Sequence, residues 1–253
     1  MENILTIKNK FKISFLLYIF IILSILTASF KNILIIFTLI TIHELGHGLM
    51  ASILGIKIDK IILYPLGGLT KINMPINTSI FKELLILING PLFQQLAYYL
   101  LLLIFKEEKE LIKNYHVLLL VFNLLPIYPL DGGKLVLLLL ELLLPFKRCL
   151  NYIIFISYLI VIFLFIRLNI YKLNILITFI FILIIITKEI NKKNHIFNKF
   201  ILERYLTTYN YRIKTIVKKI DDFYKNRNHI IIDDNKYYLE KEYLQKLFKK
   251  YSH

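Results

Sequence analysis

A nearly uninterrupted apolar run, residues 33–54, constrains this chain more than any other feature of its sequence. The run is long enough to cross a lipid bilayer as a helix, yet it contains three ionisable side chains, His43, Glu44 and His47. On a helix, histidines four residues apart leave the same face, so both imidazoles can reach one metal ion. Glu44 can then reach a water molecule on the open side of that ion. The alternative is a chance match to a short pattern, but ionisable groups within hydrocarbon by default mark a functional site.

The rest of the composition agrees with a membrane protein. Of the 253 residues, 57% are hydrophobic and the mean hydropathy is +0.64, which is too apolar for an ordinary soluble domain. The net charge of +15 follows the positive-inside pattern of membrane proteins, so we expect no nucleic-acid partner. A single cysteine, Cys149, excludes an intrachain disulfide.

We predict a polytopic α-helical membrane protein with about six transmembrane helices. The expected spans are residues 13–30, 33–54, 84–105, 117–144, 152–166 and 173–187, with tight or polar connections at 31–32 and 106–113. With six spans both termini face one side, which carries 25 of the 32 Lys and Arg residues. Both termini are therefore predicted to be cytosolic.

Residues 57–72 have a different character from the spans. β-branched residues with partial alternation are followed by Pro65, Gly67 and Gly68. This pattern predicts a β-hairpin at the membrane edge, and an ordinary connecting loop is the alternative.

The fourth expected span is broken in its middle, where Pro126, Pro129, Gly132 and Gly133 interrupt the apolar run. Prolines lack a backbone donor, so this stretch should be partly unwound where it lines a cavity. At ~1.5 Å per helical residue, Asp131 reaches roughly the membrane depth of the two histidines. Two histidines and one carboxylate form a catalytic zinc arrangement with an open position. A helix N-cap is the alternative role for Asp131.

The tail is treated as a separate domain. We divide the chain into an intramembrane core, residues 1–190, and a small cytosolic α+β domain, residues 191–253, with regulatory or substrate-docking function. Ile213, Ile216, Ile220 and Phe223 fall at helical spacing. Residues 230–232 and 237–239 flank a turn, and residues 240–251 are expected to form a final helix. The remaining histidines, which have no partner spacing, are expected to be solvated: His116, His195, His229 and His253.

These motifs together resemble those of the site-2 family of intramembrane metalloproteases, in particular its sporulation branch. The resemblance is carried by His43 to His47, by residues 123–133, by residues 63–68 and 89–92, and more weakly by the tail. It implies an intramembrane zinc endopeptidase in which His43, His47 and Asp131 hold Zn²⁺ and Glu44 is the general base. Asn123 is the candidate oxyanion donor, although a polar packing role for Asn123 is an equal alternative.

The resemblance also implies partners and a location. The expected substrate is a membrane-associated pro-form of a sporulation sigma factor, cleaved in the mother-cell membrane around the forespore, with inhibitory membrane proteins as regulators. The tail resembles a CBS motif, which suggests ATP as a ligand or assembly into a homo-oligomer. The alternatives are an inactive membrane scaffold of the same fold, a site-2 protease acting on an anti-sigma factor, and a zinc transporter, for which further ligands along a path are lacking in the other spans.

Overall fold

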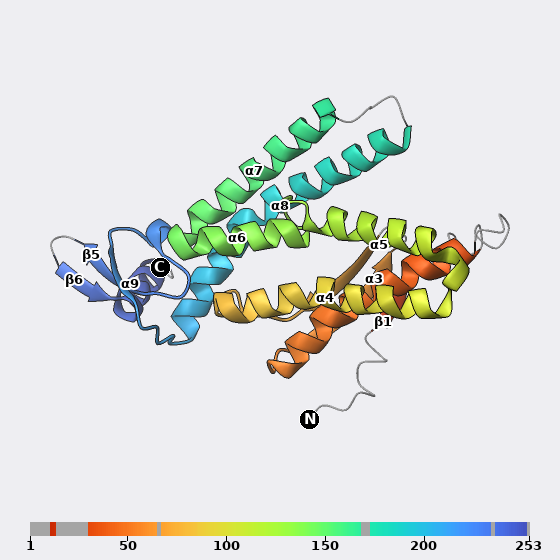
Figure 1. Cartoon of the computed structure of the whole chain (residues 1–253). Coiled ribbons are helices and arrows are strands. Elements are labelled where there is room, and N and C mark those ends of the chain that lie inside the picture. The colour runs from red at the N-terminus through yellow and green to blue at the C-terminus, as the bar shows by residue number, and fades with distance from the viewer. Residues whose placement is uncertain (1–10, 14–29, 65–66, 168–172, 234–235, 252–253) are drawn as a thin grey trace. The chain divides into compact units, whose positions relative to one another are not determined.

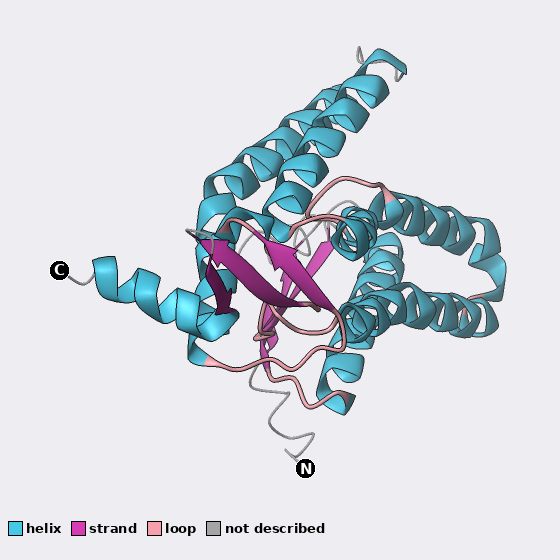
Figure 2. Cartoon of the chain, turned by 90° about the vertical axis from the view of Figure 1, so that its left-hand side faces the viewer, coloured by secondary structure: helices cyan, strands magenta, loops and turns pink. Residues whose placement is uncertain are grey.

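The computed structural model describes residues 11–13, 30–64, 67–167, 173–233 and 236–251. Helices make up most of this part of the chain, and the strands form two small sheets (Figure 2). The chain divides into two compact units. The first holds residues 1–74 and 84–123, and the second holds residues 75–83 and 124–253.

The first unit contains a three-stranded sheet, the helix with the two histidines, and two further helices. Its elements are β1 (Phe11–Ile13), α3 (Phe30–Ile53), β2 (Ile58–Tyr64), β3 (Gly67–Ile72), most of α4 (Ile80–Ile104), the 3₁₀ turn η1 (Lys106–Glu108) and α5 (Lys109–Leu124). The expected first span, residues 13–30, lies almost entirely outside the described residues. Lys31 and Asn32, expected in a connection, belong to the first turn of α3.

The predicted hairpin at residues 57–72 is present. β2 and β3 pair antiparallel, with Ile62 opposite Leu69 and an irregularity in register at Asp59. β1 adds to the other side of β2 in parallel, so the order is β1-β2-β3 and β2 is the central strand. The sequence gives no sign of β1, because a three-residue strand is too short to show a pattern.

The second unit joins three helices to the tail. Its elements are the start of α4, α6 (Asp131–Leu143), α7 (Phe146–Arg167), α8 (Leu173–Leu206), β4 (Lys214–Val217), η2 (Ile220–Asp222), β5 (Asn228–Asp233), β6 (Lys236–Leu239) and α9 (Glu240–Tyr251). α7 and α8 run side by side (Figure 1). β4 pairs parallel and β6 antiparallel with the central β5.

The core of the second unit lies where α7, α8 and the tail meet. Apolar side chains from α7 and α8 pack with others from β4, from the end of η2, from β5 and from α9: Phe146, Leu150, Phe197, Phe200, Ile201, Val217, Phe223, Ile231 and Leu244. Arg204 of α8 is 3% exposed and binds Glu240 at 2.8 Å and Asn77 at 2.7 Å. The tail is therefore fastened to the segment that precedes α4 by a buried guanidinium group.

Two predictions about local structure are wrong. The spacing of Ile213, Ile216, Ile220 and Phe223 indicated a helix, but this stretch contains β4 and a 3₁₀ turn, because pairing with β5 outweighs a short apolar period. The expected polar loop at 106–113 is helical from Lys109 onward. The final helix begins at Glu240 and ends at Tyr251, as predicted.

Three helices of the described chain are long and apolar enough to cross a membrane: α3, α4 and α7. α4 exposes a row of large apolar side chains, including Leu92, Leu96 and Leu103, each more than half exposed. Such a surface is normal against lipid and unusual in water. The molecule is therefore a mostly helical membrane protein, and the count of six spans stays a prediction.

Candidate metal centre

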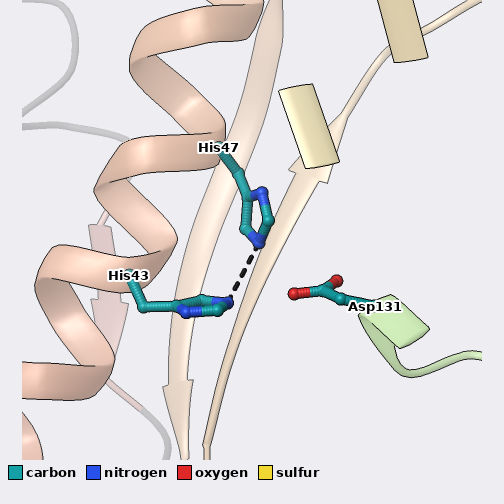
Figure 3. Close-up of side chains that lie close together, drawn as sticks. All are labelled: His43, His47 and Asp131. Atoms are coloured by element: carbon teal, nitrogen blue, oxygen red, sulfur yellow. Dashed lines mark hydrogen bonds between the residues drawn. The ribbon is translucent and has the colours of Figure 1, made fainter. Parts of the chain in front are cut away.

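The two histidines of α3 are close together and turned toward one another. His43 and His47 are 3% and 6% exposed, and their imidazoles leave the same side of the helix (Figure 3). Their Nε2 atoms lie 3.1 Å apart, with the ring planes at 81°. Two nitrogen ligands of one tetrahedral zinc, each ~2.0–2.1 Å from the ion, lie about 3.3 Å apart. The pair thus has the spacing of two ligands of one ion.

The hydrogen bonds at the far side of each ring decide which nitrogen carries the proton. Nδ1 of His47 lies 2.9 Å from the backbone oxygen of Ile86, and Nδ1 of His43 lies 3.0 Å from Oε1 of Gln94. Oxygen acceptors require an N–H at both Nδ1 atoms, so both Nε2 atoms of the neutral rings carry lone pairs. Two lone pairs at 3.1 Å repel one another unless a cation or proton lies between them. This donor set fits a divalent metal.

Gly90 of α4 makes room for the histidine pair. A Cβ atom at this position would collide with Cε1 and Nε2 of His47 and with Nε2 of His43. Gly46 has a similar role toward α4, because a Cβ there would collide with the backbone oxygen of Asn89. Both helices therefore need glycine where they approach one another near the imidazoles.

Asp131 begins α6 in the second unit and is 7% exposed. The N-cap position belongs to Leu130, and Asp131 is the first residue of the helix. Lys134 Nζ lies 3.1 Å from Oδ1 of Asp131. The expected break precedes this helix, and there Ser157 of α7 accepts the backbone N–H of Tyr128 at 2.9 Å. One backbone N–H of the unwound stretch is thus satisfied by a side chain of the same unit, as buried backbone requires.

Glycines also allow this tight turn. A Cβ at Gly132 would collide with the backbone oxygen of Leu124, and one at Gly133 with the backbone of Ile127. Only glycine permits the unwound stretch to fold back onto the first turn of α6. The two glycines therefore allow Asp131 to lie at the start of α6 directly after the unwound stretch.

The predicted ligand residues lie in the two different units, and all three are buried: His43 and His47 on α3, and Asp131 at the start of α6. Two histidines and one carboxylate are ligands that suit zinc. Glu44 is 9% exposed and directly follows His43 on α3. Asn123 lies in the last turn of α5 and is partly exposed.

Two residues near the histidines had no signal in the sequence. Gln94 is 1% exposed and contacts His43, while His116 is 5% exposed and contacts Gln94. His116 and His229 were expected to be solvated, and both are buried. Their partners come from other elements of the fold, so no spacing within their own segments could reveal them.

Comparisons with known proteins identify the family of the chain. The family model described as peptidase family M50 matches residues 31–114. The chain is 31% identical over 198 residues to stage IV sporulation protein FB of Bacillus subtilis, covering 75% of this chain and 69% of that protein. It is 34% identical over 146 residues to a zinc metalloprotease of Methanocaldococcus jannaschii, covering 52% of this chain and 42% of that protein.

A solved structure has the same fold. The site-2 protease from Methanocaldococcus jannaschii matches with a TM-score of 0.55 at 24% identity, covering 71% of this chain and 91% of that one. Histidines at metal-ligand spacing lie within the segment that the family model matches. The chain belongs to peptidase family M50, the site-2 proteases, and is a membrane zinc metalloprotease.

Proposed function

We propose that this protease cleaves a membrane-associated precursor of a sporulation sigma factor, using Zn²⁺ held by His43, His47 and Asp131. The observation that carries the catalytic assignment is the buried histidine pair, with its Nε2 atoms 3.1 Å apart and Glu44 at the next position. The substrate class is supported by the likeness to the sporulation protein FB of Bacillus subtilis. Cleavage of an anti-sigma factor is the second candidate within the same chemistry.

The residues divide the work of peptide hydrolysis. Zn²⁺ held by His43, His47 and Asp131 would lower the pKa of a bound water to about 7 and would polarise the scissile carbonyl. Glu44 takes the proton from the attacking water and delivers it to the leaving nitrogen. Asn123 donates a hydrogen bond to the carbonyl oxygen as negative charge develops there.

A transmembrane substrate must unwind before its peptide bonds can react, because helical hydrogen bonds cover them. An unwound segment can then pair with an exposed strand edge. In the sheet β1-β2-β3, the central strand β2 has partners on both sides, so β3 is the strand of the hairpin that remains for this role. We propose that β3 holds the extended substrate.

The remaining expectations concern topology and the tail. Both termini are proposed to be cytosolic, with residues 1–190 as the protease core and 191–253 as a docking or regulatory domain. Reporter fusions after Glu110 should then be extracytosolic, and fusions after residue 190 cytosolic. Inhibitory membrane proteins, a homo-oligomer and a mother-cell location remain part of the proposal. ATP at the tail finds no support in the comparisons, and the proposed function does not require it.

The test is co-expression of the chain with membrane-tethered sigma-factor precursors and anti-sigma factors from its own genome. Glu44→Gln should abolish cleavage and leave about one zinc per chain, because a base is lost and no ligand is removed. Glu110→Gln, an exposed change on α5, is the matched control and should cleave normally. Loss of zinc in Glu44→Gln contradicts the assignment of Glu44 as the base. A wild-type chain that binds these proteins without cleaving them contradicts the proposed substrates.

A further inference from the structure

Gln94 of α4 lies on the side of His43 that faces away from His47. Its Oε1 is 3.0 Å from Nδ1 of His43, and the side chain is 1% exposed. His43 therefore has both ring nitrogens engaged, Nε2 toward His47 and Nδ1 toward Gln94. All of these groups belong to the first unit.

The orientation of the Gln94 amide is fixed by its other end. Its Nε2 lies 3.0 Å from the backbone oxygen of His116 on α5 and 3.3 Å from Nδ1 of the same residue. A backbone carbonyl only accepts hydrogen bonds, so the amide nitrogen must face His116 and the amide oxygen must face His43. The proton of neutral His43 is then on Nδ1, and the lone pair is on Nε2.

The residue of α5 that accepts the hydrogen bond of Gln94, His116, is itself held in place. His116 is 5% exposed, and its ring stacks on Tyr98 of α4 with centroids 4.5 Å apart and planes at 22°. Tyr98 lies one turn after Gln94 on the same helix. The carbonyl that orients Gln94 thus belongs to a residue whose side chain is packed against α4.

We propose that Gln94 is a positioning residue, which holds His43 in the tautomer and ring orientation that a metal ligand needs, and that the backbone of α5 at His116 orients Gln94 in turn. The inference rests on the proposed role of His43 as a zinc ligand. Partners of this kind fix the tautomer of a ligating histidine and raise its basicity. His47 obtains the same support from the backbone oxygen of Ile86, which no side-chain substitution removes. The hydrogen bond at Nδ1 of His43, in contrast, comes from a side chain and can be removed by substitution.

The experiment measures zinc affinity of the purified full-length chain by competition with a chelator. Gln94→Leu removes the acceptor at similar size and should weaken zinc binding about 10–100-fold. Gln95→Leu, at the adjacent and partly exposed position, is the matched control and should bind as the wild type does. Gln94→Met, an unbranched side chain of nearly the same length that lacks the amide, should weaken zinc binding in the same way. The visible spectrum of the Co²⁺-loaded chain should change in Gln94→Leu and not in Gln95→Leu.

Equal zinc affinity and equal cobalt spectra in Gln94→Leu and the wild type overturn the inference. If Gln94→Leu does not fold, Gln94→Met decides, because wild-type zinc affinity in that variant overturns the inference and a loss of tenfold or more supports it. His43→Ala separates the two proposals. Full zinc retention in His43→Ala defeats the proposed ligand set, whereas zinc loss there with normal binding in Gln94→Leu defeats only the role of Gln94.

Discussion

The ammonium nitrogen of Lys225 lies 3.0 Å from a carboxylate oxygen of Glu141, and both residues are almost completely buried. Lys225 belongs to the tail, and Glu141 lies near the end of α6, the helix that begins with Asp131. A second carboxylate, from Glu83, lies 2.6 Å from the same ammonium group. Burial alone would lower the pKa of Lys225. The carboxylates of Glu141 and Glu83 raise this pKa by more than burial lowers it, so the net shift is upward and the lysine is charged.

Lys225→Met should destabilise the second unit by about 3–5 kcal/mol, because it leaves the Glu141 carboxylate buried without its ammonium partner. Thermal unfolding and limited proteolysis of the full-length chain in detergent measure this effect. Lys246→Met is the control, because the partner of Lys246, Asp233, is partly exposed, and the change should be much smaller. Adding Glu141→Leu to Lys225→Met should recover part of the loss. A normal melting temperature in Lys225→Met would show that the buried pair does not hold the tail.

The His229–Glu240 pair predicts a pH dependence of the second unit. His229 Nε2 accepts the backbone N–H of Tyr224 at 2.9 Å, while Nδ1 lies 2.9 Å from Glu240. Burial lowers the pKa of His229 below its usual 6.5, so the folded state favours the neutral ring. The unfolded chain then binds more protons below pH 6.5. Stability from this group is complete above that value and declines as the pH falls below it.

The melting temperature should therefore decrease as the pH is lowered from 7.5 to 5.5. His229→Gln should remove the part of this decrease that comes from His229. Glutamine can accept from Tyr224 and donate to Glu240 without titrating. Glu240 adds nothing in this range, because its pKa is lowered from 4.5 by His229 and Arg204 despite the opposing effect of burial, and its contribution is lost only at more acidic pH. An identical slope in His229→Gln and the wild type would rule out His229 as the titrating group.

The candidate metal-binding residues could be proposed from the sequence because the features that point to them are local. His43 and His47 are one helical turn apart, and the prolines and glycines around Asp131 indicate an unwound stretch through their own backbone properties. Gln94 could not be found in this way. A glutamine on an apolar helix has many possible partners. The role proposed for Gln94 depends on its contacts with His43 of α3 and with the carbonyl of His116 on α5.

The same distinction holds for the tail. The helix at Glu240–Tyr251 was predictable, since its apolar period and acidic first turn are properties of its own residues. The strand β4 was not, because it forms by pairing Ile216 with Ile230, fourteen residues along the chain. His229 was expected in water and is buried by contacts with Arg204 and Glu240, which belong to other elements.

Gly90→Ala adds only one methyl group but should strongly disturb the positions of the two imidazoles. The added methyl group would collide with both imidazoles, so either the rings or the helices must move apart. We expect zinc affinity to fall about tenfold or more, in the range seen when a ligand's support is lost. Leu92→Ala on the exposed face of α4 is the control and should leave zinc affinity unchanged. Wild-type affinity in Gly90→Ala would mean that the histidines do not depend on this close approach.

Asp131→Ala should lower zinc occupancy if its carboxylate is the third ligand. Lys134→Met tests the other role that the carboxylate could have, since Nζ of Lys134 lies 3.1 Å from Oδ1 of Asp131. Zinc measured by atomic absorption should be reduced in Asp131→Ala and near the wild-type level in Lys134→Met. Equal zinc content in Asp131→Ala and the wild type would limit Asp131 to the ion pair and leave the third ligand unidentified.

The substrate-holding role of β3 can be tested through its backbone. In an antiparallel pair, adjacent residues point their N–H groups alternately toward and away from the partner strand. Leu69 and Thr70 are adjacent and pair with Ile62 and Ile61, so only one of the two N–H groups points away from β2. A proline removes the N–H and is tolerated at an edge only where that group is unpaired in the free protein.

Of the two single variants, Leu69→Pro and Thr70→Pro, one should therefore keep zinc and thermal stability yet lose most of its cleavage. The other should weaken the hairpin itself. Leu69→Val and Thr70→Val keep every N–H and are the matched controls, which should cleave normally. Ile62→Pro is less informative, because Ile62 lies in the central strand and pairs with both Lys12 and Leu69. If the proline variant that retains zinc and stability also cleaves at the wild-type rate, the substrate does not pair with β3.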